Sequence, residues 1–186
     1  MKKRIVATCI ITLTLLVLTP FAQGNNAVHK TNLFHQVKFG VLAHDVPDLW
    51  SGFNREDGVD LNIEAILGPS YTVLGGTLRP AIGGSINTAG DTSKGYIDAL
   101  WQYDFNNKIF LVIGLGAAVH SGKKNFTTSE RKALGSRVLF HVPLELGYYV
   151  TPQTTVSAYF SHISNANAAK ENEGLDTIGV RFGYIF

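Results

Sequence analysis

The last ten residues of the chain, Thr177–Phe186, decide the fold, and they read TIGVRFGYIF. Apolar side chains stand at every second position of this stretch, at Ile178, Val180, Phe182, Tyr184 and Phe186. The positions between them hold Thr177, Gly179, Arg181 and Gly183. Because successive side chains of a β-strand point to opposite faces, this alternation predicts a strand with one apolar face and one face of polar residues and glycine.

The same alternation recurs along the chain, whereas helical periodicity is hard to find. We expect eight strands, at Val37–Asp45, Gly58–Leu67, Leu74–Ile86, Tyr96–Tyr103, Ile109–Ser121, Arg137–Tyr149, Thr154–Ser164 and Leu175–Phe186. An apolar outer face with a polar inner face is typical of a membrane barrel, and the inverse arrangement would give a soluble barrel with an apolar interior. The alternation alone does not choose between the two.

The N-terminal segment indicates export. Residues 1–24 combine basic residues at the start, an apolar run from Ile5 to Leu18 and small residues at the end. This is the pattern of a secretory signal peptide, with cleavage expected between residues 24 and 27, and a retained anchor is the alternative. The mature chain, residues 25–186, is expected to be one domain without cysteine, because Cys9 leaves with the signal.

Two further features favour the bacterial outer membrane. The predicted connections alternate between short turns and longer loops, which is usual for outer-membrane barrels. A final strand with alternating aromatics and a terminal Phe186 resembles the recognition signal of the bacterial outer-membrane assembly machinery. The predicted fold is therefore all-β: an eight-stranded antiparallel transmembrane β-barrel of the bacterial outer membrane, with both termini on the short-turn side.

An eight-stranded barrel is filled by side chains and is not a pore. We expect a structural polar network inside it, formed by Lys38, His44, Asp60, Glu64, Arg79, Asp98, His141, Glu145 and Arg181. Removal of the signal leaves 13 of the 16 Lys and Arg residues against 14 Asp and Glu residues, so the mature chain has a net charge of about −1. Nothing in this balance indicates a nucleic-acid partner.

The candidate site lies in Tyr159–Asp176, which reads YFSHISNANAAKENEGLD. The apolar face of the seventh predicted strand includes Phe160, and His162 and Ser164 continue its parity. Asp176 has outward parity on the last strand as well. Facing residues in such a hairpin have Cβ atoms about 4.5–5.5 Å apart, so we expect the three polar side chains to converge on the lipid side.

These residue types suit ester hydrolysis. A serine hydroxyl becomes nucleophilic when a base such as His162 takes its proton, and a carboxylate such as Asp176 can orient the imidazole ring. The amides of Asn165 and Asn172 would stabilise the oxyanion, and the outward direction implies a lipid ester as substrate. The alternative is structural, with the histidine in an interfacial belt and Ser164 in a loop that touches headgroups.

This C-terminal region resembles the lipid A 3-O-deacylase family called PagL, which is also grouped with acyloxyacyl hydrolases. The shared features are an aromatic strand, His-x-Ser-Asn, a loop with Asn and Gly, a carboxylate and a final aromatic strand. The resemblance implies an outer-membrane serine esterase that removes the ester-linked 3-O acyl chain of lipid A in lipopolysaccharide, with no cofactor and no metal.

By position, the resemblance makes His162 the general base, Ser164 the nucleophile and Asp176 the acidic member of a triad, and it associates Asn165, Asn172 and Gly174 with the oxyanion. The best-known members have Glu where this chain has Asp176. Aspartate is shorter by one methylene, so a small backbone shift is expected. The nearby Glu171 and Glu173 are the alternative carboxylates.

The expected partner is lipid A or lipopolysaccharide in the outer-membrane lipid, and the oligomeric state stays open, a homodimer included. Basic residues of the third long loop would contact its phosphates, with a solvated loop as the alternative: Lys123, Lys124, Arg131, Lys132 and Arg137. Two other functions compete with the esterase. One is a non-enzymatic small outer-membrane barrel with a structural or adhesion role, and the other is a periplasmic lipid-binding barrel of the lipocalin type.

Overall fold

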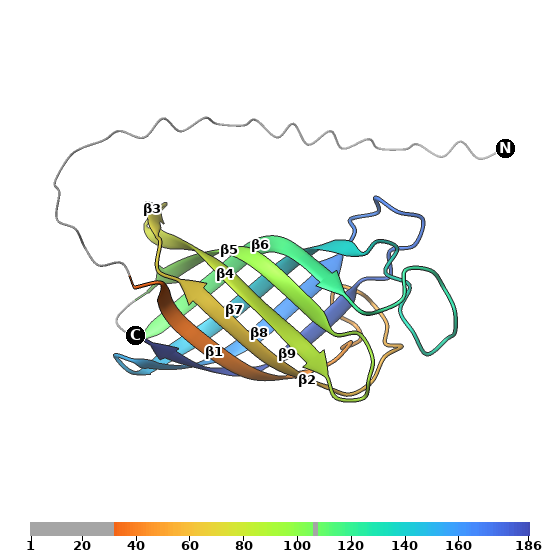
Figure 1. The fold of residues 1–186 in the computed structure, drawn as a ribbon. Helices are drawn as coiled ribbons and strands as arrows, with labels where there is room; N and C mark the ends of the chain where they lie inside the picture. Colours follow the sequence, from red (N-terminus) through yellow and green to blue (C-terminus); the bar gives the residue numbers. More distant parts are fainter. Residues whose placement is uncertain (1–31, 106–107) are drawn as a thin grey trace. The chain divides into compact units, whose positions relative to one another are not determined.

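The computed structural model describes residues 32–105 and 108–186, and the predicted signal peptide at residues 1–24 lies outside them. The described chain folds into an antiparallel β-barrel (Figure 1). Its strands are β1 (Phe34–Ala43), β2 (Val59–Leu67), β3 (Tyr71–Val73), β4 (Gly76–Asn87), β5 (Lys94–Asp104), β6 (Ile109–His120), β7 (Val138–Thr151), β8 (Thr154–Ser164) and β9 (Leu175–Ile185).

Except for β2 and β3, strands that follow one another in the sequence pair with each other, and β1 also pairs with β9. Pairing of β2 with β4 completes the circle, while the short β3 extends the sheet beside β4. The wall is therefore a closed barrel of eight strands, as predicted. In the described ranges, no helix is long and apolar enough to cross a membrane.

The first strand begins three residues earlier than predicted, at Phe34, and the third begins two residues later, at Gly76. Leu74 and Gly75 have φ angles of 49° and 77°, and they form the turn between β3 and β4. A two-residue hairpin turn often needs positive φ at both central residues, a conformation that leucine rarely adopts. The sequence hides this turn because Leu74 continues an apolar run.

The predicted faces of the strands are confirmed. Leu61 on β2, Leu146 on β7 and Val180 on β9 are 54%, 56% and 62% exposed. The residues next to them in the chain, Asp60, Glu145 and Arg181, are buried. An apolar outer wall of this extent is stable against lipid and costly against water, so the lipocalin-type alternative with an apolar interior is excluded.

The barrel interior holds a network of ion pairs. Lys38 Nζ lies 2.8 Å from Glu145 Oε2, and Arg181 bridges Glu145 and Glu64. The ring of Tyr159 packs on the guanidinium of Arg181, with its centroid 4.1 Å from Cζ. Pairing offsets the cost of taking these charges out of water, and removal of one partner would leave another charge buried and unpaired.

The other residues predicted for this network lie in three places. His141 and Asp98 form a separate interior pair, in which Nδ1 is 2.9 Å from both carboxylate oxygens. His44 lies just beyond β1, in a cluster of loop charges. Arg79 is only partly buried and donates from NH1 to the carbonyl of Gly68, because it stands near the β2–β4 connection and not at the barrel centre.

The two ends of the barrel differ (Figure 1). Short connections join β2 to β4 and β7 to β8 at the end where β1 begins and β9 ends. Longer loops at residues 44–58, 121–137 and 165–174 gather at the opposite end. The alternating connection lengths predict this arrangement, except that the β4–β5 connection at residues 88–93 is shorter than the β2–β4 connection at residues 68–75.

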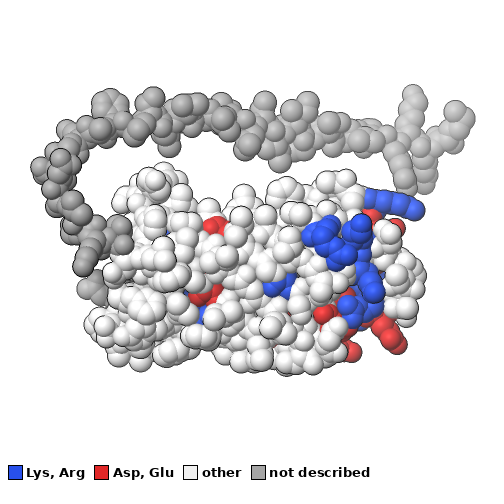
Figure 2. All heavy atoms as spheres, viewed as in Figure 1, with Lys and Arg blue, Asp and Glu red and all other residues white. Residues whose placement is uncertain are grey.

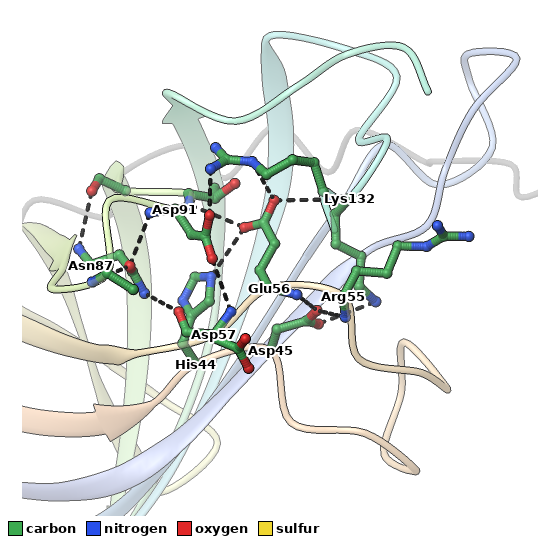
Figure 3. Close-up of polar contacts among 12 residues, drawn as sticks. His44, Asp45, Arg55, Glu56, Asp57, Asn87, Asp91 and Lys132 are labelled. Carbon is green, nitrogen blue, oxygen red and sulfur yellow. Dashed lines mark hydrogen bonds and ion pairs between the residues drawn. The ribbon is translucent and has the colours of Figure 1, made fainter. Parts of the chain in front are cut away.

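A cluster of buried charges joins the β1–β2, β4–β5 and β6–β7 loops (Figure 3). Glu56 accepts hydrogen bonds of 3.0 Å from the N–H groups of Lys132 and Thr92, and it contacts His44 Nε2 at 3.1 Å. Asp45 accepts a hydrogen bond from the N–H of Glu56 and pairs with Lys132 Nζ at 3.1 Å. Since these residues come from three different loops, the cluster ties those three loops to one another.

The charges of this cluster support one another. Burial lowers the pKa of His44, but hydrogen bonds to Asp60 and Glu56 outweigh burial and raise the pKa to about 9. Burial raises the pKa of Glu56, but hydrogen bonds from His44 and from backbone N–H groups outweigh it and lower the pKa to about 2. At neutral pH, His44 is therefore a cation and Glu56 an anion.

Candidate active site

His162 and Asp176 face each other across β8 and β9. They are direct partners in the strand register, and His162 Nδ1 lies 2.6 Å from Asp176 Oδ1. The aspartate side chain is thus long enough to reach the ring. Because the carboxylate accepts a hydrogen bond from Nδ1, Nε2 is the ring nitrogen that keeps a lone pair in the neutral histidine.

A loop covers this pair from the outside. His162 is only 5% exposed, although its parity on β8 points it outward. Trp50 stacks on it, with ring centroids 4.4 Å apart and an interplanar angle of 13°. The N–H of Ser51 donates to Asp176 Oδ2 at 2.6 Å, and the N–H of Val46 donates to the carbonyl of Asp176 at 3.1 Å.

No sequence pattern identifies Trp50 or Ser51 as part of the site. They lie in the irregular β1–β2 loop, far from the C-terminal motif in the sequence. The barrel brings this loop to the last hairpin because β1 pairs with β9. The sequence offers one weak signal, because Trp50 is a single tryptophan in the loop after the first predicted strand.

Ser164 and His162 line the same pocket, whose volume is about 710 Å³. Trp50, Phe53 and Arg55 form the wall contributed by the β1–β2 loop. Within the part of the chain that the structure describes, neither Ser164 Oγ nor His162 Nε2 has a hydrogen-bond partner. The nucleophile and the base that the sequence predicts are therefore both unengaged and next to one cavity.

The two predicted asparagines differ in what they already bind. Asn165 Nδ2 donates to the carbonyls of Leu134 and Glu171, at 2.9 and 2.6 Å, so both amide hydrogens are used between the loops. Asn172 Nδ2 donates one hydrogen bond, of 3.0 Å, to Asn167 Oδ1 and keeps a second hydrogen. Of the two side chains, only that of Asn172 lines the pocket with a hydrogen to spare.

Gly174 lies against the imidazole ring. Its φ is 65°, and a Cβ at this position would approach His162 Cε1 to 2.9 Å. A side chain here would be strained and would also press on the ring. Glycine therefore lets the backbone of the β8–β9 loop pass directly beside the histidine.

The alternative carboxylates lie elsewhere. Glu173 Oε2 accepts a hydrogen bond of 2.6 Å from the N–H of Ala133, and its Oε1 is 3.4 Å from Arg55 NH2. Glu171 holds Asn165 through its carbonyl. Asp176 is the one of the three acidic residues that contacts the histidine. No group of three or more His, Cys, Asp or Glu side chains in residues 32–105 and 108–186 could hold a metal ion.

The basic residues of the β6–β7 loop fall into two groups. Lys132 is fully buried and paired with a carboxylate of the loop cluster, so its predicted contact with phosphate is wrong. Arg131 and Arg137 are also bonded to neighbouring loop groups. Lys123 and Lys124 are exposed. Figure 2 shows the visible basic side chains gathered mainly at the loop end, while the wall of the barrel is largely uncharged.

Comparison with known proteins supplies the family. Residues 67–185 match the family described as Lipid A 3-O-deacylase (PagL). The chain belongs to this family. A curated relative, the lipid A deacylase PagL of Bordetella bronchiseptica (strain ATCC BAA-588 / NCTC 13252 / RB50), is 27% identical over 180 residues, which cover 95% of this chain and 93% of the relative.

Solved structures agree with the fold. The crystal structure of the outer membrane enzyme PagL has a TM-score of 0.62 at 19% identity, and the match covers 81% of this chain and 99% of that one. Neisserial surface protein A has a TM-score of 0.50 at 16% identity, with 81% and 96% covered. As a member of the PagL family, this chain is an outer-membrane barrel and a lipid A deacylase. Lipid A deacylases are ester hydrolases.

Proposed function

We propose that this chain removes the 3-O-linked acyl chain of lipid A as a serine esterase, with Ser164 as nucleophile, His162 as general base and Asp176 as the acidic member. The hydrogen-bonded pair of His162 and Asp176 on the outer face carries the proposal, because Ser164 follows on the same face and lines the same pocket. A base held by a carboxylate beside a free serine hydroxyl is the arrangement that activates serine.

In the first half of the reaction, His162 Nε2 takes the proton of Ser164 as Oγ attacks the carbonyl carbon of the ester. The tetrahedral intermediate collapses by breaking the bond to the sugar oxygen, which receives the proton from the imidazolium. The acyl chain remains on Ser164. His162 Nε2 then takes a proton from water as the water oxygen attacks the acyl-serine. The bond to Ser164 Oγ breaks, the imidazolium returns the proton to that oxygen, and the fatty acid leaves. Asp176 stays ionised throughout and stabilises the imidazolium.

The negative oxygen of the intermediate needs hydrogen-bond donors. We assign this role to the second amide hydrogen of Asn172 and to the backbone N–H of Gly174, because both residues line the pocket. The role of Asn165 is then to hold the β8–β9 loop against the β6–β7 loop through its two donated hydrogen bonds. This assignment divides the residues associated with the oxyanion into two direct donors and one support.

The direction of the site supports a membrane lipid as substrate. The strand face that carries the triad continues the apolar wall of the barrel, so an acyl chain can stay in the lipid phase while its ester enters the pocket. Export is also required, and we infer that residues 1–24 are removed, with cleavage between residues 24 and 27. N-terminal sequencing of the membrane-extracted protein tests that inference.

The decisive experiment is expression of the unaltered chain and of Ser164→Ala in a Gram-negative host, followed by mass spectrometry of lipid A. The unaltered chain is expected to remove one 3-hydroxyacyl group. Ser164→Ala is expected to lower the rate by at least about 10³-fold, because loss of a nucleophile removes the covalent route. A matched control is Ser157→Ala, which removes a buried serine on the opposite face of β8.

Two results would contradict the proposal. Unchanged lipid A with the unaltered chain would favour the non-enzymatic barrel. Full activity in Ser164→Ala would remove that residue from the nucleophile role and leave the deacylase class standing.

A further inference from the structure

We propose that Trp50 and Ser51 are positioning residues of the hydrolase, and that the β1–β2 loop closes over the outer side of His162 and Asp176 and fixes both members of the pair. The inference rests on the proposed function of that pair. It adds a second, remote part of the chain to a site that otherwise comes entirely from the last hairpin.

The first contact is between two rings. Trp50 lies almost parallel to His162, with an angle of 13° and 4.4 Å between centroids. Such stacking restricts rotation of the imidazole about its side-chain bonds and holds Nε2 in one direction. When the histidine accepts the serine proton, the face of the indole also lies next to the new positive charge, which is a favourable cation–π geometry.

The second contact is with the carboxylate. Asp176 Oδ1 accepts a hydrogen bond from His162, and Asp176 Oδ2 accepts one of 2.6 Å from the N–H of Ser51. Each oxygen therefore has its own donor, and the plane of the carboxylate is fixed. Hydrogen bonds to an ionised oxygen are stronger than neutral ones, so this backbone contact is well suited to hold a short aspartate in place.

The loop that presents these groups is itself anchored. Asp45 Oδ2 accepts hydrogen bonds from the N–H groups of Arg55 and Glu56, which joins the two ends of the loop. Lys132 Nζ pairs with Asp45 and donates to the carbonyl of Phe53. Figure 3 shows Asp45, Arg55, Glu56 and Lys132 together at this point. The charge cluster therefore sets the position of the loop over the site.

The loop also changes what surrounds the pair. Trp50 is 61% exposed while the histidine beneath it is 5% exposed. The outward side of the pair is thus covered by an aromatic ring, and the open side is the pocket with Ser164. A polar pair at the lipid boundary is costly when it faces hydrocarbon, and the indole removes that contact.

Kinetics with micellar lipid A test the role of Trp50. Trp50→Ala is expected to lower kcat about 10–100-fold with little change in KM, since misplacement of a catalytic group slows the chemical step. Trp50→Phe keeps a stacking ring and is expected to recover most of the rate. Leu49→Ala, which removes an exposed neighbour outside the pocket lining, serves as the matched control. A normal kcat in Trp50→Ala would overturn the role.

Ser51 is tested by a pair of substitutions. Ser51→Pro removes the N–H that binds Asp176 and is expected to lower kcat about tenfold or more. Ser51→Ala keeps the N–H and removes only the hydroxyl, so it is expected to retain much more of the rate than Ser51→Pro. Equal rates in the two variants would show that the backbone donor is not needed.

A fluorescence measurement separates this inference from the proposed function. The chain has two tryptophans, so Trp101→Phe leaves Trp50 as the only indole. Its anisotropy is expected to be high and to fall in Trp101→Phe/His162→Ala, because the stacking partner is gone. It should remain high in Trp101→Phe/Ser51→Ala. No fall in the His162 variant would overturn the stack, whatever the activity. A correct anisotropy pattern in a protein without deacylase activity would instead reject the proposed function and keep the contact.

Discussion

Two histidine–aspartate pairs in this barrel have the same chemistry and different surroundings. His141 and Asp98 lie inside the barrel, fully or almost fully buried, and Tyr96 packs on the histidine with ring centroids 4.3 Å apart. His162 and Asp176 lie on the outer face, with Trp50 on one side and a pocket on the other. In both pairs Nδ1 binds the carboxylate and Nε2 has no hydrogen-bond partner among the described residues.

The difference teaches that access and neighbours, not the pair itself, select a site for catalysis. The inner pair stands beside Lys94 and other network residues that compensate its charge, and no substrate can reach it through a filled interior. The outer pair has a free serine hydroxyl within its cavity. The same two residue types can therefore stabilise one part of a barrel and serve chemistry in another.

The largest expected effect on kcat comes from replacing the aspartate of the outer pair by asparagine, and the same replacement in the inner pair is the comparison. Asp176→Asn is expected to lower kcat about 10²–10⁴-fold with the fold intact, because an amide favours the wrong tautomer of His162. Asp98→Asn is expected to leave kcat near normal and to lower stability by about 1–3 kcal/mol, because it disturbs a buried network. Lipid A kinetics and thermal unfolding in detergent measure the two effects.

The contrast between the two pairs would be wrong if Asp98→Asn lowered kcat and Asp176→Asn lowered only the stability. Glu173→Gln is a useful control, since Glu173 lines the pocket but binds Ala133 and Arg55. Normal activity in Asp176→Asn together with loss of activity in Glu173→Gln would transfer the acidic role to the glutamate.

The next largest effect is expected at Asn172, the amide donor in the pocket beside the outer pair. Asn172→Asp keeps an oxygen that can accept the hydrogen bond from the N–H of Asn165, and it replaces the NH₂ group with a second acceptor. We expect kcat to fall about 10²–10³-fold, because one oxyanion donor is lost. Kinetics on a short-chain ester measure this without dependence on lipid packing. An unchanged kcat would leave Gly174 as the remaining candidate.

A third histidine, His44, provides a test of stability against pH. Its pKa of about 9 exceeds the ordinary value of 6.5, so the stabilisation is complete below about pH 6.5 and is lost as the pH rises through about 9. We expect His44→Asn to lower stability by about 1–3 kcal/mol at pH 6.5 and to remove this alkaline loss. Thermal unfolding in detergent between pH 6 and about 10 checks the prediction. Parallel curves for the two proteins would contradict it.

The smallest effect is expected at the exposed cations of the β6–β7 loop. Replacement of Lys123 and Lys124 by Gln should raise KM for lipid A about 3–10-fold without changing kcat, because a lysine near an anionic surface contributes about 1 kcal/mol. Lys170→Gln on the β8–β9 loop is the control for a general charge effect. Should KM stay constant in the double variant, the loop is simply solvated.

Much of the fold follows from local pattern. The alternation in Val59–Leu67 and Leu175–Ile185 predicts which side chains face lipid, and the structure agrees. The turn at Leu74 and Gly75 escapes prediction because its left-handed backbone falls on a residue type that disfavours it. Burial of Lys132 escapes prediction as well, because its partner Asp45 comes from another loop.

The sequence by itself determined the barrel, its outer face and the approach of His162 to Asp176. Alternation with a period of two assigns each residue to a face, and a hairpin brings two neighbouring strands into register, so these features depend on local order in the chain. Only the tertiary structure decided that Trp50 covers the histidine, that the N–H of Ser51 binds the second oxygen of Asp176, and that Asn165 is used up between loops. The contacts of Trp50 and Ser51 form only when the first strand pairs with the last, and the contact of Asn165 with Leu134 joins the β8–β9 and β6–β7 loops. No local pattern carries that information.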